Sequence, residues 1–268
     1  VQALTKVQRK FVISTAVNNR TPLGKLGQFE QIFVRDIKSL EKLQGLHQHV
    51  YYMPDVASVL EGNADQGHQL VRDSFAKQEL DLYGKKIAVV LNAYLLPQGQ
   101  ALARDFVNFH RVVHELAKLA DNTAASFVFL PMSVRLPHDD RCSNGYLASQ
   151  CKYWRKNLLV TDAWTVSQTM DVLASCDLVI STRLHASIFA CVNGVPLVDL
   201  VHHDKNRHYL AAAGLQDSML NYWELDSKAL RRTVQDVLAE PHKHVSRMRE
   251  LARQQRALLI DQARKLII

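Results

Sequence analysis

The chain has 268 residues, of which 47% are hydrophobic and 22% are charged. This balance is typical of a soluble globular protein, and the length allows one large domain or two modest ones. No apolar run approaches the roughly 18 residues that a membrane span needs. Residues 1–6 lack the basic tip and apolar core of a signal peptide.

The net charge of +7 favours polyanions, anionic membrane surfaces or small acidic substrates as partners. The basic residues are dispersed and form no recognisable nucleic-acid-binding module, so we expect no nucleic-acid partner. The cysteines lack CxxC spacing, and Cys176 and Cys191 lie in apolar surroundings. This favours reduced, mostly buried thiols over disulfides or a zinc site, and predicts a cytoplasmic protein.

Short β-rich runs alternate with helical stretches, which is the pattern of a largely parallel α/β sheet. Several runs are continuously apolar, as expected for strands that are covered on both faces. Apolar residues at helical spacing predict helices at 101–120 and 242–268. The predicted strands are residues 11–15, 32–35, 50–53, 86–91, 126–130, 157–160, 177–181 and 196–201.

Polar residues at 62–84 interrupt this pattern and suggest a domain boundary. We predict an N-terminal α/β lobe at 1–80, a Rossmann-like lobe at 81–241 and a C-terminal helix at 242–268 that packs across the lobes. Only about three strands precede the boundary, so the first lobe looks incomplete. The basic face of the last helix is expected to be solvated, with contact to a membrane as the alternative.

The most informative stretch is residues 177–196, which reads DLVISTRLHASIFACVNGVP. A buried strand ends at Ser181, and Ser181 or Thr182 is expected to cap the helix that follows. Arg183 and His185 then lie in the first helical turn at the carboxyl end of a parallel strand, where open α/β sheets bind ligands. A helix N-terminus favours anions, and a guanidinium binds a carboxylate or phosphate through two parallel hydrogen bonds.

A structural explanation of the same residues stays open. Arg183 can instead make a salt bridge between the lobes, and His185 can be half-buried against Ile188 and Phe189. The residues alone do not choose between these interpretations, because charged groups at helix ends are also often structural.

The loop at 201–208 follows the neighbouring predicted strand and is expected to open into the same crevice. Lys205 supplies a second cation there, and Asp204 can orient a base or bind a hydroxyl. His and Asp residues this close also suggest a metal, but adjacent residues on a turn point apart, so we expect none. A further loop at 133–153, which contains Arg135, follows a strand and is expected near the cleft.

These runs resemble the polysaccharide pyruvyl transferase family. The segment DLVISTRLHASIFACVNGVPLVDLVHHDK at 177–205 is similar to the family's strand, Arg-Leu-His, helix, Gly-Val-Pro and acidic-Lys pattern. IFVRDIKSL at 32–40 resembles its strand that ends in Arg-Asp, and Pro54-Asp55 resembles the turn after it. The resemblance implies two Rossmann-like lobes, similar to two-lobed GT-B-like glycosyltransferases, with the active site between them.

The activity implied is transfer of pyruvate from phosphoenolpyruvate onto a sugar of a cell-surface polysaccharide or glycan precursor, forming a ketal. No cofactor or metal is required. By the same resemblance the candidate catalytic residues are His185, Asp36 and Asp204, with His185 as general acid or phosphate-side donor and the two Asp as possible bases. The candidate substrate-binding residues are Arg35, Arg183, Leu184, Lys205, Asn92 and Arg135.

The family's glycine-rich opening loop has no equivalent before Phe11, which places acceptor binding and activity in question. Two other hypotheses therefore stay open: a nucleotide-sugar glycosyltransferase and a non-catalytic glycan-binding relative. The partners expected are phosphoenolpyruvate and a sugar acceptor, which is either free or linked to a lipid. Peripheral association with the inner face of the cell membrane would bring enzyme and acceptor together.

Overall fold

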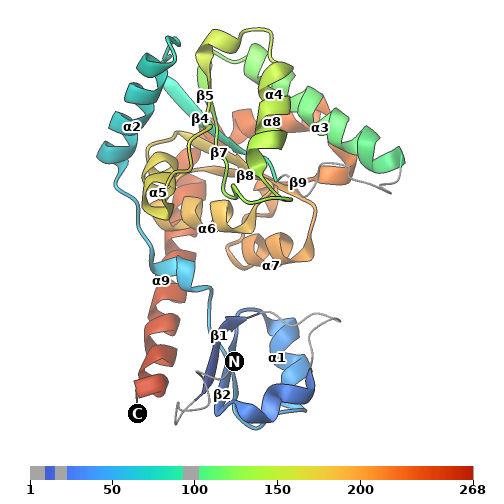
Figure 1. Ribbon diagram of the computed structural model, residues 1–268, viewed down its shortest axis with the longest axis vertical. Coiled ribbons are helices and arrows are strands. Elements are labelled where there is room, and N and C mark those ends of the chain that lie inside the picture. The colour runs from blue at the N-terminus through green and yellow to red at the C-terminus, as the bar shows by residue number, and fades with distance from the viewer. Residues whose placement is uncertain (1–9, 16–22, 93–102, 268) are drawn as a thin grey trace. The chain divides into compact units, whose positions relative to one another are not determined.

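The computed structural model describes residues 10–15, 23–92 and 103–267, and it divides into two compact units (Figure 1). The first unit comprises residues 1–59 with 252–268, and the second comprises residues 60–251. Both sheets are parallel, as the alternation of strands and helices predicts.

The first unit holds a three-stranded sheet in the order β1-β2-β3. These strands confirm the first three predicted ones within two residues, and helix α1 follows β2 at Ile37–Gln44. The small core consists of Ile32, Val34, Leu43 and Val50. The strands are β1 (Phe11–Thr15), β2 (Gln31–Val34) and β3 (Val50–Tyr52), with helical turns η2 (Leu23–Gln28) and η3 (Val56–Val59).

The second unit is built on a six-stranded sheet in the order β6-β5-β4-β7-β8-β9. Numbered within this unit, the strand order is 3-2-1-4-5-6, the arrangement of dinucleotide-binding sheets. The order reverses between β4 and β7, which pair from Ile87 with Leu178 to Val90 with Ser181. The strands are β4 (Lys85–Val90), β5 (Ala125–Phe129), β6 (Asn157–Leu159), β7 (Leu178–Ser181), β8 (Leu197–Val201) and β9 (Met219–Asn221).

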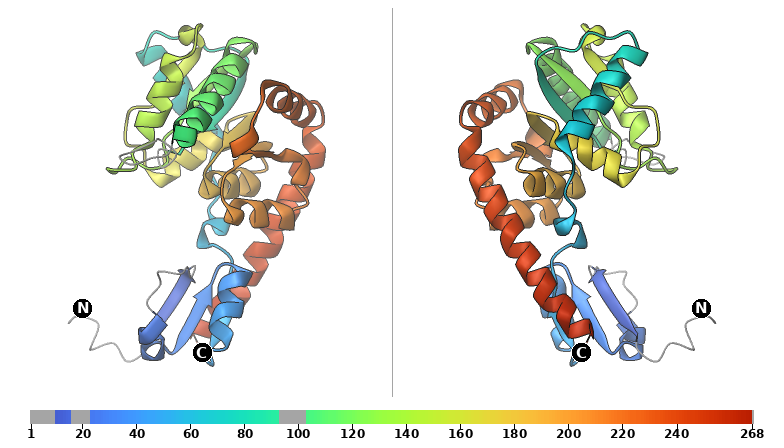
Figure 2. Two further views of the ribbon diagram at one scale, coloured as in Figure 1. Left: turned by 90° about the vertical axis from the view of Figure 1, so that its right-hand side faces the viewer. Right: turned by 90° about the vertical axis from the view of Figure 1, so that its left-hand side faces the viewer.

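Helices cover both faces of this sheet (Figures 1 and 2). On one face, apolar residues of α3, α4 and α8 form one core with alternate residues of the strands, such as Ile87, Val89 and Phe127. Helices α5 and α6 bury Val172, Leu173 and their neighbours on the other. The helices are α2 (Ala64–Lys77), α3 (Ala103–Asp121), α4 (Asp140–Ser149), α5 (Val166–Ala174), α6 (Leu184–Asn193), α7 (Asp204–Ala212), α8 (Ser227–Ala239) and α9 (Pro241–Ile267), with turns η5 (Trp154–Lys156), η6 (Gln216–Ser218) and η7 (Tyr222–Glu224).

The polar stretch at 62–84 contains helix α2, which packs within the second unit. A Cβ placed on Gly67 would lie 1.9 Å from the backbone oxygen of Asp171 in α5, so only glycine allows this approach. The Asn63 N–H also donates to the Asp171 carboxylate at 2.7 Å. Residues 60–80, which the sequence analysis placed in the first lobe, are therefore tied to α5.

Three further elements differ from the predictions. Strand β9 was not predicted, since its three residues carry no periodic signal. Half of the predicted loop at 133–153 is helix α4, and most of the predicted loop at 201–208 is the start of α7. The long C-terminal helix is confirmed as α9, whose residues from Ala252 onward belong to the first unit.

Candidate functional site

The point at which the strand order reverses lies between the carboxyl ends of β4 and β7. The N–H of Asn92, just after β4, donates to Oγ1 of Thr182 at 2.8 Å. The N–H of Thr182 donates in turn to the carbonyl oxygen of Val90 at 3.0 Å. These bonds fix the two strand ends together, at the place where open α/β sheets bind their ligands.

Helix α6 begins directly at this point. Arg183 is the N-cap, and its side chain makes no capping hydrogen bond. The expectation that Ser181 or Thr182 is the cap residue is wrong, because Ser181 Oγ instead accepts the N–H of Arg183 at 2.8 Å and stabilises the turn before the helix. The helix ends at Gly194 in the left-handed conformation, with φ of 64°. The partial positive charge of the helix N-terminus therefore faces the switch point.

The guanidinium of Arg183 forms an ion pair with a buried carboxylate. Its Nη2 donates to Oδ1 of Asp140 at 2.5 Å, and Asp140 is 0% exposed. The other Asp140 oxygen accepts the N–H groups of Met132 and Ser133, each at 3.0 Å. Arg183 keeps 23% of its side chain exposed, and its buried Nε has no hydrogen-bond partner among the described residues. The guanidinium is thus positioned by Asp140 and stays partly exposed at the carboxyl edge of the sheet.

The structure shows which contacts Arg183 and His185 make within the second unit. The ion pair of Arg183 joins two elements of the second unit, α6 and α4, and its partner Asp140 was not anticipated as a site residue. His185 is exposed on the first turn of α6 rather than half-buried, although Ile188 and Phe189 of the same helix are buried. Both residues therefore present polar groups at the carboxyl edge of the sheet.

Helix α7 brings further polar groups to this edge. His203 is its N-cap, and Nδ1 of His203 accepts the N–H of Lys205 at 3.3 Å. Asp204 and Lys205 lie exposed in the first turn. Burial lowers the pKa of the half-buried His202 to about 4, and the nearby charges of His203, Lys205 and Arg183 act in the same direction. His202 therefore stays neutral near pH 7, and this residue was not predicted as part of the site.

A single buried carboxylate ties α6 to α7. Asp199 of β8 is 0% exposed, and its Oδ2 accepts the Ser187 hydroxyl of α6 at 2.5 Å. Nδ2 of Asn206 in α7 donates to both Asp199 oxygens, at 3.2 and 3.0 Å. Burial raises the pKa of Asp199 to about 6, although the hydrogen bonds from Ser187 and Asn206 act to lower it. Helices α6 and α7, which carry His185 and Lys205, are therefore fixed against β8 and each other.

The other predicted residues are placed as follows. Leu184 is the first residue of α6, and Arg135 is exposed in the turn that precedes α4. In the first unit, Nη1 of Arg35 pairs with Oδ2 of Asp55 at 2.7 Å. Asp36 caps α1, where its two oxygens accept the backbone N–H and the hydroxyl of Ser39 at 2.8 and 2.7 Å. The predicted residues thus form two groups, one in each unit.

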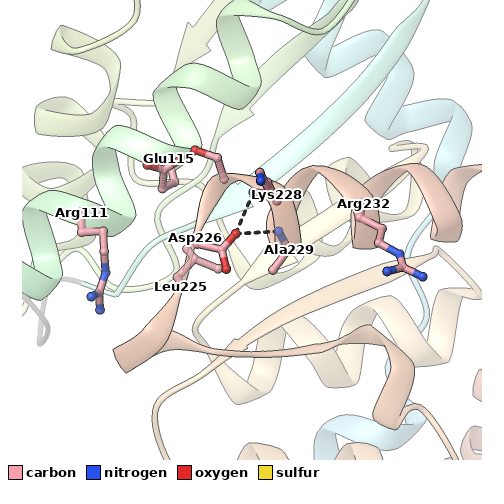
Figure 3. Close-up of a pocket in the computed structure, with 8 residues that line it drawn as sticks. Arg111, Glu115, Leu225, Asp226, Lys228, Ala229 and Arg232 are labelled. Atoms are coloured by element: carbon pink, nitrogen blue, oxygen red, sulfur yellow. Dashed lines mark hydrogen bonds between the residues drawn. The ribbon is translucent and has the colours of Figure 1, made fainter.

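A separate hollow of about 570 Å³ lies between α3 and α8 (Figure 3). Its acidic groups are engaged by the protein itself. Asp226 accepts the N–H groups of Lys228 and Ala229 at the start of α8, and Glu115 accepts the Ser227 hydroxyl. Arg111, which like Glu115 belongs to α3, donates to the carbonyl oxygen of Trp223. We assign no ligand to this hollow.

Within residues 10–15, 23–92 and 103–267, no three His, Cys, Asp or Glu side chains gather as a metal-binding group. In the same residues no helix has the length and hydropathy that crossing a membrane requires. The four cysteines are free thiols, with Cys142 exposed and the other three buried.

Solved structures with a similar fold are two-lobed GT-B glycosyltransferases. A UDP-forming α,α-trehalose-phosphate synthase from Burkholderia xenovorans is 12% identical with a TM-score of 0.56, and the match covers 94% of this chain and 66% of that one. The synthase from Burkholderia multivorans is 12% identical with a TM-score of 0.57, and the match covers 91% of this chain and 61% of that one. The E. coli trehalose-6-phosphate synthase bound with UDP-2-fluoro glucose is 14% identical with a TM-score of 0.54, and the match covers 91% of this chain and 64% of that one.

Identities this low show the fold alone, and they confirm the predicted α/β class with Rossmann-like lobes. The chain spans less than two-thirds of the length of these synthases. No curated protein sequence matches the chain. The family model described as polysaccharide pyruvyl transferase matches residues 24–203, more than half of the chain, and includes both the Arg35-Asp36 and the Arg183-Leu184-His185 segments. The chain therefore belongs to the polysaccharide pyruvyl transferase family.

Proposed function

We propose that this protein transfers pyruvate from phosphoenolpyruvate onto two hydroxyls of a sugar in a polysaccharide or its precursor, forming a cyclic ketal. The observation that carries the proposal is Arg183, held by buried Asp140 at the N-terminus of α6 beside the switch point. The site is therefore built for an anion. Membership of the family supplies the class of reaction.

Phosphoenolpyruvate carries a carboxylate and a phosphate, so its site needs several fixed hydrogen-bond donors. Arg183 offers its remaining N–H groups, and the first turn of α6 adds backbone N–H groups and a favourable dipole. Lys205, on the first turn of α7, is the second cation of this unit. Arg35, in the first unit, stays a candidate substrate-binding residue by the family pattern alone.

The chemistry balances without an oxidant or a metal. His185 protonates the methylene carbon of phosphoenolpyruvate, which leaves an electrophilic carbon that bears the carboxylate and the phosphate ester. One sugar hydroxyl adds to that carbon, and a second displaces phosphate, so that two C–O bonds form and one breaks. Of the two protons that the hydroxyls lose, one replaces the proton given to carbon and the other leaves with phosphate.

A base must receive a proton from each attacking hydroxyl. Asp204 is exposed in the first turn of α7, on the same edge of the sheet as His185. Asp36 has both oxygens bonded to Ser39, which favours a structural task at α1. We therefore propose Asp204 as the base. A cytoplasmic location beside a lipid-linked acceptor belongs to the same proposal, and the net charge of +7 supports proximity to an anionic membrane.

The fold suggests one alternative ligand, a nucleoside diphosphate, because the similar solved structures include a synthase bound to UDP-2-fluoro glucose. A cationic edge that accepts phosphoenolpyruvate can also accept a nucleoside diphosphate. A single experiment separates the two: the thermal midpoint of the whole chain, titrated in parallel with phosphoenolpyruvate, UDP and inorganic phosphate. A ligand that binds only the folded state adds about 2.7 kcal/mol of stability at a hundred-fold excess over its Kd.

We expect phosphoenolpyruvate to raise the midpoint more than phosphate does. Arg183→Ala should weaken this effect by about ten-fold or more in Kd, because a hydrogen bond to a charged group contributes about 1.5–3 kcal/mol. Arg72→Ala is the matched control, since Arg72 is an exposed arginine of α2 whose Nη2 donates to Oε1 of Gln69 at 2.9 Å. A shift with UDP alone would replace the proposal with a glycosyltransferase, and no shift with phosphoenolpyruvate would refute donor binding.

A further inference from the structure

The amino edge of the six-stranded sheet carries a second hollow, of about 610 Å³, at the opposite ends of the strands from Arg183. It is lined by residues just before β4, β5 and β6. Three aromatic side chains stand exposed around it, Tyr83 at 49%, Tyr153 at 53% and Trp154 at 58%. We call this the amino-edge hollow. Exposed aromatic groups gathered at one concave place on a surface are typical of a binding site.

The wall of the hollow is rigidly built. The two carboxylate oxygens of Asp121 accept the N–H groups of Lys152 and Tyr153, each at 3.0 Å. Asp81 donates its N–H to the Arg155 carbonyl oxygen at 2.7 Å and accepts Nε of Arg155 at 3.1 Å. These bonds fix the backbone that carries the aromatic side chains before any ligand arrives, which lowers the entropy cost of binding.

Cations lie against these rings. Lys152 Nζ is 5.4 Å and Lys156 Nζ 5.9 Å from the centre of the Tyr153 ring. The Arg155 guanidinium is 5.8 Å from the centre of the Trp154 ring. Cations over aromatic faces form attractive contacts that also position the charge. Arg155 is itself paired with Asp81, and Lys156 donates to the carbonyl oxygen of Thr123 at 2.6 Å. The lining has three cations and two carboxylates, so its net charge is positive.

Flat rings and fixed cations around a concave surface match a sugar ring that bears a carboxylate. The apolar C–H face of a pyranose packs on an aromatic ring, and its carboxylate meets the ammonium groups. We propose that the amino-edge hollow is a second glycan-binding site, separate from the transfer site, and that it takes an acidic segment of polysaccharide. The choice of a glycan rests on the proposed function, because each pyruvyl ketal adds one carboxylate to the polymer.

A site of this kind holds the polymer at one end of the unit while the transfer site acts at the other. Binding of the glycan to this site is measured without phosphoenolpyruvate, so the test does not depend on the transfer reaction. Four probes separate the sources of affinity: alginate, which is an acidic glycan; dextran, a neutral one; polyglutamate, an acidic polymer without sugar; and vesicles of phosphatidylcholine with phosphatidylglycerol. The full chain is titrated with each, at low and at high salt.

We expect alginate to bind best, and to bind less tightly at high salt because the cations are exposed. Trp154→Ala should weaken alginate binding by about ten-fold, the usual scale for truncating a central aromatic contact. Lys152→Glu, a second exposed position, should weaken it as well. Trp223→Ala is the matched control, because Trp223 is 42% exposed but lies outside the hollow. Equal thermal midpoints establish that the variants are folded.

Three results would overturn the proposal. Equal binding of alginate by the original chain and by Trp154→Ala places the glycan elsewhere. Polyglutamate that binds as well as alginate shows charge without recognition of sugar. Vesicle binding that is lost in Trp154→Ala, without alginate binding, assigns the hollow to a membrane surface. Loss of the phosphoenolpyruvate effect in Arg183→Ala is independent of all three, so failure here and failure of the proposed transfer are distinguished.

Discussion

The carboxyl group of Asp199 makes the stability of the second unit depend on pH in a direction opposite to that of most acidic groups. An ordinary Asp has a pKa of about 3.9, and burial raises that of Asp199 to about 6. Between these pH values the folded state holds the proton more tightly than the unfolded state does, so the contribution of Asp199 to stability falls as the pH rises from about 4 to about 6. The shift of the pKa from about 3.9 to about 6 corresponds to about 3 kcal/mol in the free energy of unfolding.

Asp199→Asn removes this titration. We expect the free energy of unfolding of the original chain, minus that of the variant, to fall by about 3 kcal/mol between pH 4 and pH 7 and to be constant above. Urea unfolding followed by tryptophan fluorescence gives this difference for the second unit alone, because the three tryptophans all lie within residues 60–251. Groups that titrate in both proteins cancel in the subtraction.

A difference that is the same at every pH would refute this reasoning. The Ser187 hydroxyl provides a second check, since its hydrogen bond lowers the pKa of Asp199. Ser187→Ala should therefore move the upper end of the pH-dependent interval to a higher pH. A shift in the other direction would show that the hydroxyl bonds the protonated rather than the ionised carboxyl group.

Three further predictions test the site and its support. Gly67→Ala should lower the stability of the second unit by about 1–3 kcal/mol, because the new methyl overlaps the backbone of α5; Gly84→Ala, where nothing lies within 4 Å, is the control in the same urea assay. Under native conditions only Cys142 should react rapidly with a maleimide, because burial raises the pKa of the other three thiols to about 12; mass spectrometry of the labelled peptides checks this. Asp140→Asn should destabilise the unit and weaken phosphoenolpyruvate binding about ten-fold, with little further loss when combined with Arg183→Ala, because the two residues act as one pair.

The strands of the second unit could be predicted because continuous apolar runs such as IAVVL and LVIS mark buried parallel strands. The same reasoning placed Arg183 and His185 at a helix start. Helix α4 was missed since only a few of its residues are buried and its sequence, DRCSNGYLAS, has little apolar periodicity. Helix α2 was missed because Gly67, which local propensity counts against a helix, is required by its contact with α5.

The partner of Arg183 shows where sequence reasoning ends. Asp140 is 43 residues away, and nothing local distinguishes it from Asp139, whose carboxylate pairs instead with Arg141. Only the crossing of α4 over the carboxyl edge of the sheet makes Asp140 the buried member of the pair. Long-range pairs of this kind come from topology rather than from spacing, so a family pattern around Arg-Leu-His identifies the cation but not the group that orients it.

The two buried carboxylates explain how a cationic edge can exist before an anion binds. Arg183 and the N-terminus of α6 place positive charge at one edge of the sheet, which is unfavourable without a counter-charge. Asp140 neutralises the guanidinium from behind, and Asp199 fastens both helices to β8 through uncharged donors. In the proposed reaction the ligand therefore does not have to assemble the site. It meets donors that are already oriented, and for that reason a substitution at either buried carboxylate should impair binding even though neither carboxylate contacts the ligand.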